Sequence, residues 1–263
     1  MAVRGIPRRE PPRDVVVAPD AAALAEMAAE RIAKLAEEAV ARAGRFAVAL
    51  AGGATPRGLY ACLASEPYRA RLPWRETHVF WGDERCVGPE HPESNYRMAA
   101  ETLLRHVPVR PGQIHRMRGE DPDPDRAAAE YDALLRETFG LAPGVLPRLD
   151  LILLGLGADG HTASLFPGSP ALRETERLAV AVFVERLGAR RLTVTLPVLN
   201  AAAATLFLVS GGGKAEILRT VLEAVPDAEP LPAQLVGPPA GTVTWLVDAA
   251  AASLLGGEAG GAP

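Results

Sequence analysis

The sequence predicts an α/β fold: a Rossmann-like, mostly parallel sheet flanked by helices on both faces of a single domain. Three observations predict it. Short apolar runs alternate with helix-like stretches almost throughout the 263 residues, which is typical of a parallel sheet covered on both faces. Hydrophobic residues make up 48% of the chain, enough for a sizeable core. No repeat and no linker-like stretch divides the chain, so we expect one domain over residues 14–255.

The predicted strands are short apolar runs bounded by glycine, proline or charged residues. In chain order they span residues 14–18, 46–50, 77–81, 149–154, 178–184, 191–196, 205–210 and 242–247. Before the first strand, the Pro- and Arg-rich residues 1–13 predict a flexible lead. After the last strand and its helix, the Gly-rich residues 256–263 predict a disordered tail.

The predicted helices begin where a capping residue or a proline precedes an Ala-rich or amphipathic stretch. Asp20 and Ser94 are such caps, and Pro56 stands at a first helical position. Gly44 ends the first helix. The predicted helices span residues 20–42, 56 onward, about 95–104, 125–139 and 214–224, with a short turn from 197 and a short Ala-rich helix after 247.

Composition argues against several classes of protein. The net charge of −4 disfavours a general nucleic-acid binder. The two cysteines, Cys62 and Cys86, form no CxxC or Cys/His cluster, so we expect neither a disulfide framework nor a structural zinc. There is no apolar run of membrane-spanning length and no secretory signal. We therefore expect a cytoplasmic protein with no metal and no nucleic-acid or membrane partner.

The stretch from Asp150 to Pro170, DLILLGLGADGHTASLFPGSP, is the first place to look for chemistry. A buried strand ends there in a glycine-rich loop, and ligands of open α/β sheets bind just beyond the carboxyl ends of strands. His161 can act as a base near neutral pH, and Asp159 lies two residues before it. These two residues are the predicted catalytic pair.

The same stretch contains a literal G-x-G-x-x-G at residues 155–160, the dinucleotide fingerprint. We disfavour that interpretation because the fingerprint needs a helix directly after the glycines, and Pro167 and Pro170 interrupt one. Asp159 would also place a negative charge near the pyrophosphate. The glycines more simply let the backbone turn tightly and approach a small ligand.

Glycines also follow a second predicted strand, in the sequence Ala-Gly-Gly-Ala-Thr-Pro-Arg. Gly52 and Gly53 precede a helix, where free backbone amides and the helix dipole favour an anion. Thr55 and Arg57 add a hydroxyl and a cation. A tight turn with a solvated arginine explains the same residues equally well.

Two further strand ends carry charged residues. Arg85, in Gly-Asp-Glu-Arg, can hold a phosphate through paired hydrogen bonds, and Asp83 can accept from sugar hydroxyls. An internal salt-bridge cluster that fixes the following loop is the alternative. Lys214, after three glycines, stands at a helix start, where a cation opposes the dipole unless an anion binds. A merely exposed lysine is the alternative there.

Taken together, these motifs resemble the 6-phosphogluconolactonase family of the sugar-phosphate isomerase-like superfamily. The resemblance covers roughly residues 15–250. It is carried by Gly52-Gly53 with Thr55-Pro56, Phe80–Arg85, Ser94-Asn95-Tyr96, Gly155–Pro167, Val198-Leu199-Asn200 and Gly213-Lys214-Ala215. Ala51 and Ala54 depart from the family, where serine or threonine is common, so two hydroxyl contacts to phosphate are missing.

The resemblance implies hydrolysis of 6-phospho-D-glucono-1,5-lactone without cofactor or metal, in a monomer or homodimer. It implies that His161 activates a water, that Asp159 orients the imidazole and that Asp83 and Asn95 bind sugar hydroxyls. The phosphate would be held by residues of three strand ends: Gly52, Gly53, Thr55, Arg57, Arg85 and Lys214.

Two alternatives remain at this point. A glucosamine-6-phosphate deaminase shares the Asp-Gly-His step but typically continues with Ile-Ala-Phe-Asn-Glu-Pro, whereas this chain reads Thr-Ala-Ser-Leu-Phe-Pro after His161. A sugar-phosphate sensor that binds without turnover usually carries an added domain, for which this chain has no room.

Overall fold

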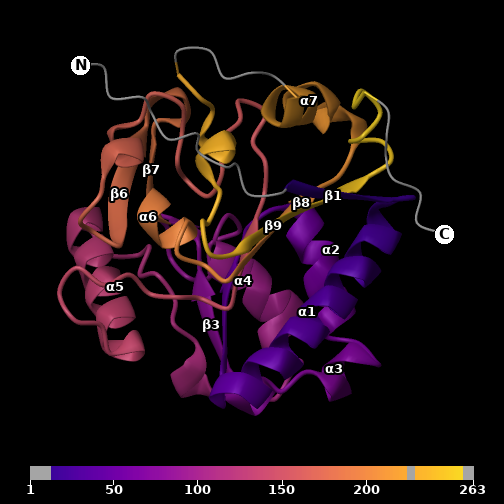
Figure 1. Ribbon diagram of the computed structural model, residues 1–263. Coiled ribbons are helices and arrows are strands. Elements are labelled where there is room, and N and C mark those ends of the chain that lie inside the picture. The colour runs from indigo at the N-terminus through magenta and orange to yellow at the C-terminus, as the bar shows by residue number, and fades with distance from the viewer. Residues whose placement is uncertain (1–12, 224–228, 257–263) are drawn as a thin grey trace, which may run out of the picture.

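The structure is a computed structural model that describes residues 13–223 and 229–256 (Figure 1). The predicted flexible lead and disordered tail therefore lie outside the described residues, apart from Arg13 and Gly256. In the described part of the chain, no helix is both long and apolar enough to cross a membrane.

The main sheet has six strands, and every neighbouring pair is parallel, as the sequence predicts. In spatial order the strands are β1 (Arg13–Ala18), β9 (Thr242–Asp248), β8 (Ala204–Val209), β5 (Leu151–Leu154), β2 (Phe46–Leu50) and β3 (Thr77–Trp81). From β2 the chain moves to β3 at one edge, and from β5 it moves the other way to β8 and β9. The adjacent ends of β2 and β5 therefore form a topological switch point, where open α/β sheets bind ligands.

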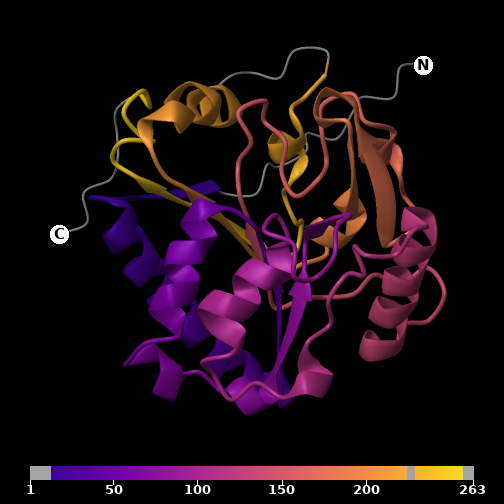
Figure 2. The same cartoon turned by 180° about the vertical axis from the view of Figure 1, so that it is seen from behind.

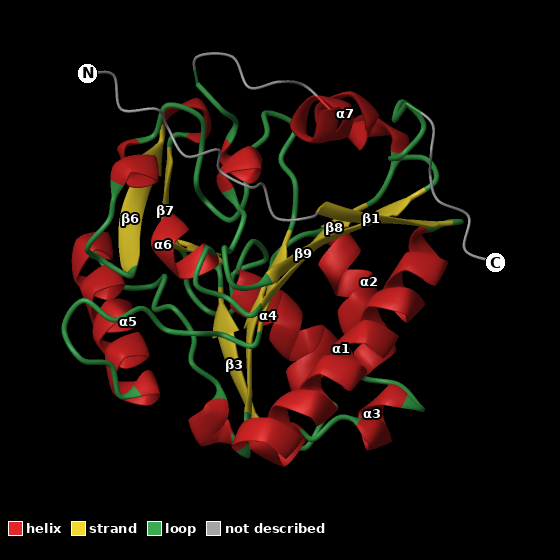
Figure 3. Ribbon diagram, viewed as in Figure 1, coloured by secondary structure: helices red, strands yellow, loops and turns green. Residues whose placement is uncertain are grey.

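A second, antiparallel sheet of three strands stands beside the first (Figure 3). It consists of β4 (Asp83–Arg85), β7 (Ala189–Val194) and β6 (Ala179–Val184). The predicted strands at 178–184 and 191–196 are thus present, but as a hairpin outside the main sheet. Residues 83–85, which the sequence places at the end of the predicted strand 77–81, form a separate strand in which Asp83 pairs with Thr193 and Arg85 with Arg191.

Helices cover both faces of the main sheet (Figures 1 and 2). They are α1 (Ala21–Ala43), α2 (Ala54–Leu63), α3 (Tyr68–Arg71), α4 (Asn95–Ala99, continued by a π-helical turn, Ala100–Leu104), α5 (Pro124–Phe139), α6 (Leu196–Leu199) and α7 (Ala215–Glu223). Short 3-10 turns lie at Trp74–Glu76, Pro111–Gln113, Pro170–Arg173, Glu185–Leu187, Gly212–Lys214 and Pro232–Leu235.

Side chains of β2 alternate between two hydrophobic cores, as the two-residue period of a strand requires. Phe46, Val48 and Leu50 pack with α1, α2 and α4 on one face. Ala47 and Ala49 belong to the core on the other face, which α5, α6, α7 and the small sheet enclose. Both faces of the central strands are thus buried, which explains their continuous apolar sequence.

The long helix α1 begins and ends at the capping residues that the sequence predicts. The Asp20 carboxylate accepts hydrogen bonds from the backbone N–H groups of Ala22 and Ala23, both at 2.9 Å. At the other end Gly44 adopts φ 70°, and its N–H donates to the Val40 carbonyl at 2.8 Å. The predicted helix at 20–42 is confirmed.

One predicted element is wrong: residues 249–254, after β9, form hydrogen-bonded turns rather than an Ala-rich helix. The Asp248 carboxylate accepts from the N–H groups of Ala251 and Gly211, at 2.8 and 2.9 Å. The helical pattern stops after one turn, since Leu255 bonds only three residues back, to Ala252. Local side-chain bonding therefore outweighs the helix propensity of alanine.

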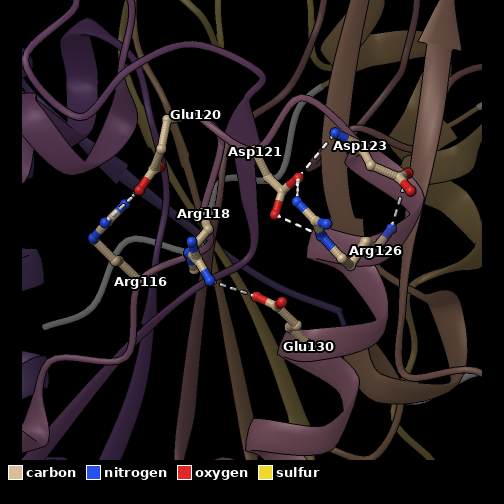
Figure 4. Close-up of polar contacts among 7 residues, drawn as sticks. All are labelled: Arg116, Arg118, Glu120, Asp121, Asp123, Arg126 and Glu130. Carbon is tan, nitrogen blue, oxygen red and sulfur yellow. Dashed lines mark hydrogen bonds and ion pairs between the residues drawn. The ribbon is translucent and has the colours of Figure 1, made fainter.

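Charged residues fix the segment that leads into α5 (Figure 4). Asp123 caps the helix by accepting from the N–H groups of Asp125 and Arg126, and Asp121 is paired with Arg126 at 2.6 Å. The segment presses on β4 at Gly119, where a β-carbon would overlap the Arg85 carbonyl. This segment therefore packs directly against the backbone of Arg85.

Candidate active site

A cavity of about 340 Å³ opens at the carboxyl ends of β2 and β5, at the switch point of the sheet. Loops from both sheets line it. Six of the predicted site residues take part in that lining: Gly52, Asp83, Arg85, Asn95, His161 and Lys214. Gly53, Thr55, Arg57 and Asp159 do not.

The loop after β5 closes on itself around His161. The Gly157 N–H donates to the His161 carbonyl at 2.8 Å, and the Gly160 N–H donates to the Gly157 carbonyl at 3.0 Å. A β-carbon on Gly157 would overlap the His161 imidazole, so only glycine fits there. No helix follows until the short turn at Pro170. The glycine pattern thus makes room for an imidazole, and the structure offers no helix to hold a pyrophosphate.

Asp159 and His161, the two residues predicted to be a catalytic pair, are in direct contact. Oδ1 of Asp159 meets Nδ1 of the imidazole in a short hydrogen bond and also accepts from the His161 backbone N–H at 3.2 Å. Partial burial pushes the pKa of Asp159 upward, but the hydrogen bonds from the His161 side chain and backbone and the charge of the imidazole together lower the pKa below its usual value. An ionised Asp159 holds the proton of a neutral imidazole on Nδ1 and leaves Nε2 free to accept one.

Asp83 and Asn95 lie together at the cavity wall, and protein donors already occupy both carboxylate oxygens of Asp83. Its Oδ1 accepts from Nδ2 of Asn95 at 3.3 Å, and its Oδ2 accepts from the Ser164 hydroxyl at 2.7 Å. Nδ2 of Asn95 also donates to the Asp83 carbonyl at 2.9 Å. Gly52 must be glycine, because a β-carbon would overlap the Asn95 carboxamide. Asp83 thereby connects the histidine loop, which is the loop after β5 that carries His161 and Ser164, to β4 and α4.

Glu84, beside Asp83, is only 2% exposed and fixes the loop before α4. Its Oε1 accepts from the N–H groups of Arg85 and Asn95, both at 2.7 Å. Its Oε2 accepts from the Tyr96 N–H at 2.8 Å and the Ser94 hydroxyl at 3.1 Å. Burial raises the pKa of Glu84, and the three backbone N–H donors oppose that rise. Hydrogen bonds, rather than the salt bridges considered from the sequence, therefore organise this loop.

Four cationic side chains line the cavity: Arg85, Arg186, Arg191 and Lys214. Arg85 and Arg191 stand directly opposite each other on β4 and β7, a pairing of like charges that a bound anion would relieve. Burial and the charge of Arg85 lower the pKa of Arg191. Among the described residues that line the cavity, Asp83 is the one carboxylate, so the cavity favours an anionic ligand.

Sequence reasoning missed Arg186, Arg191 and Ser164. Two adjacent arginines in an otherwise apolar strand were the available signal for Arg191. The sequence could not show that β7 pairs with β4, about 100 residues earlier, and this register brings Arg191 to the cavity.

The remaining predicted phosphate ligands lie around the start of α2 and the end of β8. The Thr55 hydroxyl is bonded to the Ser210 hydroxyl at 2.8 Å, and Gly53 adopts φ 108° before the helix. Arg57 is exposed on α2, outside the cavity lining. Lys214 is half-buried in the turn before α7, and no carboxylate of the described residues forms an ion pair with it.

Comparisons with known proteins agree with this architecture. Residues 19–245 match the family model of glucosamine-6-phosphate isomerases/6-phosphogluconolactonase. A 6-phosphogluconolactonase of Nostoc sp. is 40% identical over 243 residues, which cover 92% of this chain and 98% of the relative. One from Synechocystis sp. is 43% identical over 198 residues, which cover 75% and 80%. The solved 6-phosphogluconolactonase of Trypanosoma brucei superposes with a TM-score of 0.83 at 28% identity, over 94% of this chain and all of that one.

Proposed function

This chain belongs to the glucosamine-6-phosphate isomerase/6-phosphogluconolactonase family, and we propose that it hydrolyses 6-phospho-D-glucono-1,5-lactone to 6-phosphogluconate, a step of the pentose phosphate pathway. Relatives that match over nearly their full length carry the lactonase name. The cationic cavity suits a small phosphorylated substrate. The Asp159–His161 contact is the single observation that carries the hydrolytic mechanism.

In that mechanism Nε2 of His161 takes a proton from a water as the water oxygen attacks the lactone carbonyl. The carbonyl π electrons move to oxygen, and the tetrahedral oxyanion is stabilised by donors already in place, for which the loop amides between Gly157 and His161 are our candidates. When the carbonyl re-forms, the bond to the ring oxygen breaks. The imidazolium returns its proton to that oxygen, which becomes a hydroxyl, so acid and base steps use one histidine.

We place the phosphate where cations and free amides meet: Lys214, Arg85 and the amides of Gly52 and Gly53, with the Thr55 hydroxyl nearby. Anchoring this remote group would position the carbonyl against His161, which is how binding energy is converted into rate.

Arg57 would act only from outside the cavity lining. We therefore expect Lys214→Ala to raise KM at least ten-fold and Arg57→Ala to raise it much less. Asp83 and Asn95 would reach sugar hydroxyls only alongside the bonds they already make.

The decisive experiment measures lactone hydrolysis with the substrate generated in the cuvette and spontaneous opening subtracted, beside a glucosamine 6-phosphate deamination assay. We expect acceleration in the first and none in the second. His161→Ala should lower kcat about 10²–10⁴-fold while 6-phosphogluconate still binds. His106→Ala, which alters an exposed histidine bonded to the Glu101 carbonyl, is the matched control.

Deamination without lactone hydrolysis would move the chain to the isomerase branch of the family. Binding of sugar phosphate without either reaction would support a sensor. Near-normal turnover in His161→Ala would refute the base assignment.

A further inference from the structure

The turn between β6 and β7 brings an arginine to the catalytic pair. Arg186 lies in the short 3-10 turn Glu185–Leu187, and its Nη2 is 3.0 Å from Oδ2 of Asp159. Its guanidinium also lies over the Phe166 ring, 5.2 Å from the ring centroid. The Phe166 ring is in turn 4.3 Å from the His161 ring. The Phe166 ring therefore contacts both the guanidinium and the imidazole, and these two groups both contact the Asp159 carboxylate.

Asp159 divides its two oxygens between these neighbours. Oδ1 is bonded to the imidazole Nδ1, and Oδ2 is paired with the guanidinium. An ion pair on Oδ2 stops the carboxylate from rotating and so keeps Oδ1 directed at Nδ1. The arginine charge also cancels part of the attraction that the carboxylate exerts on an imidazolium. The ion pair therefore keeps the imidazole oriented, and the guanidinium charge opposes a positive charge on it.

No other arginine or lysine of the described residues is in ion-pair contact with Asp159. The further charged groups that face His161 across the cavity come from β4, β7 and the turn before α7. They are Asp83, Arg85, Arg191 and Lys214.

We propose that Arg186 is a positioning residue for the lactonase reaction: through Asp159 it orients His161 and lowers the pH at which the imidazole becomes protonated, which extends activity into mildly acidic solution. This inference rests on the proposed function. Arg186 acts through the carboxylate rather than on the reacting atoms.

The test compares Arg186→Met with Arg190→Met, which removes a neighbouring arginine that lies outside the cavity lining, 4.0 Å from Asp125. We expect the acid limb of the kcat/KM profile to move to higher pH by about 0.3–0.6 unit in Arg186→Met, the size of effect an exposed charge has near a titrating group. We expect kcat at neutral pH to fall about 2–10-fold, with KM within about two-fold. Arg190→Met should leave all three values unchanged, and Arg186→Lys should restore most of the pH shift.

Two further measurements separate this role from a merely structural one. Raising the salt concentration should move the acid limb of the wild-type enzyme toward that of Arg186→Met but leave the variant unmoved, because the effect is electrostatic. NMR titration of the imidazole C–H signals should show the same displacement of the His161 titration midpoint in Arg186→Met, and it requires no turnover. The chain has five histidines, and the His161 signal can be assigned because it disappears in His161→Ala.

The outcomes are distinguishable from failure of the proposed function. An inactive wild-type protein whose His161 titration still moves in Arg186→Met would refute the lactonase assignment and leave the Arg186 contact intact. An active enzyme in which neither profile moves overturns the inference. A large rise in KM at an unmoved pH midpoint would make Arg186 a substrate ligand instead, which also overturns it.

Discussion

At the scale of single residues, Asp83 shows how a structure changes the meaning of a motif. The resemblance implies that it binds a sugar hydroxyl, yet both of its carboxylate oxygens already accept from protein groups, Asn95 and Ser164. Its main role is therefore structural: it connects the histidine loop to β4. Holding the loop in place depends on the hydrogen bonds of Asp83 more than on its charge. Substitutions of Asp83 can separate the effect of the hydrogen bonds from that of the charge.

Asp83→Asn should be much milder than Asp83→Ala. An amide keeps one acceptor for Asn95 and can donate to the Ser164 oxygen, so we expect kcat to fall less than about ten-fold. Alanine removes the acceptor of the Ser164 hydroxyl and leaves Asn95 only its bond to the backbone carbonyl of residue 83, so we expect a loss of at least 100-fold together with about 1–3 kcal/mol of unfolding free energy. Steady-state kinetics and urea denaturation would measure both, with Ser164→Ala as the intermediate case. Equal losses for the amide and alanine variants would show that the charge itself is required.

Sequence reasoning succeeded for residues whose neighbours are close in the chain. Asp159 and His161 are two positions apart in a Gly-rich stretch, which predicts a tight turn. It failed for Arg186 and Arg191, because their place depends on how one hairpin packs against a strand far away in sequence. Local chemistry can be predicted from a single sequence, whereas register between distant strands cannot.

At the scale of elements, the parallel strands were predictable because burial on both faces leaves them continuously apolar. The strand β4 was missed because its three residues, Asp83 to Arg85, are all charged. It exists because its backbone pairs with β7 and because Glu84 organises the loop that follows. The buried Glu84 carboxylate ties this strand to the start of α4.

Glu84→Gln should destabilise the protein by about 1–3 kcal/mol. Glutamine offers one acceptor oxygen, and its amide group would face the Tyr96 N–H, a donor that then has no partner. Because the same loop carries Arg85 and Asn95, kcat/KM should fall as well. Glu93→Gln, which changes an exposed carboxylate of the same loop, is the matched control and should alter neither value. A Glu84→Gln protein as stable as the wild type would show that this carboxylate is dispensable for the loop.

At the scale of the whole molecule, the order of the strands locates the site more firmly than any motif does. The chain leaves β2 and β5 in opposite directions, and the cavity lies at that switch point. The antiparallel sheet then supplies a second wall that the main sheet lacks. His161 and the residue that holds its loop, Asp83, thus belong to different layers, so the proposed activity should depend on the integrity of the whole fold.

That integrity should weaken in mild acid because of a histidine pair near the edge of the sheet. His115 is stacked on Phe80, and its Nε2 lies 3.0 Å from Nδ1 of His78. Burial, aided by the charge of His78, lowers the pKa of His115 to about 4. Between pH 6.5 and 4 the unfolded chain therefore binds a proton that the folded protein does not, so stability falls as the pH drops through that range.

We expect this one group to remove about 2 kcal/mol of unfolding free energy between pH 7 and pH 5. His115→Phe keeps the stacking on Phe80 but cannot be protonated, so its stability should depend less steeply on pH even if it is less stable than the wild type at pH 7. Urea denaturation at the two pH values measures the difference, and His106→Ala, at an exposed position, should keep the wild-type dependence. If the wild type and His115→Phe lose the same stability between the two pH values, acid sensitivity comes from elsewhere in the fold.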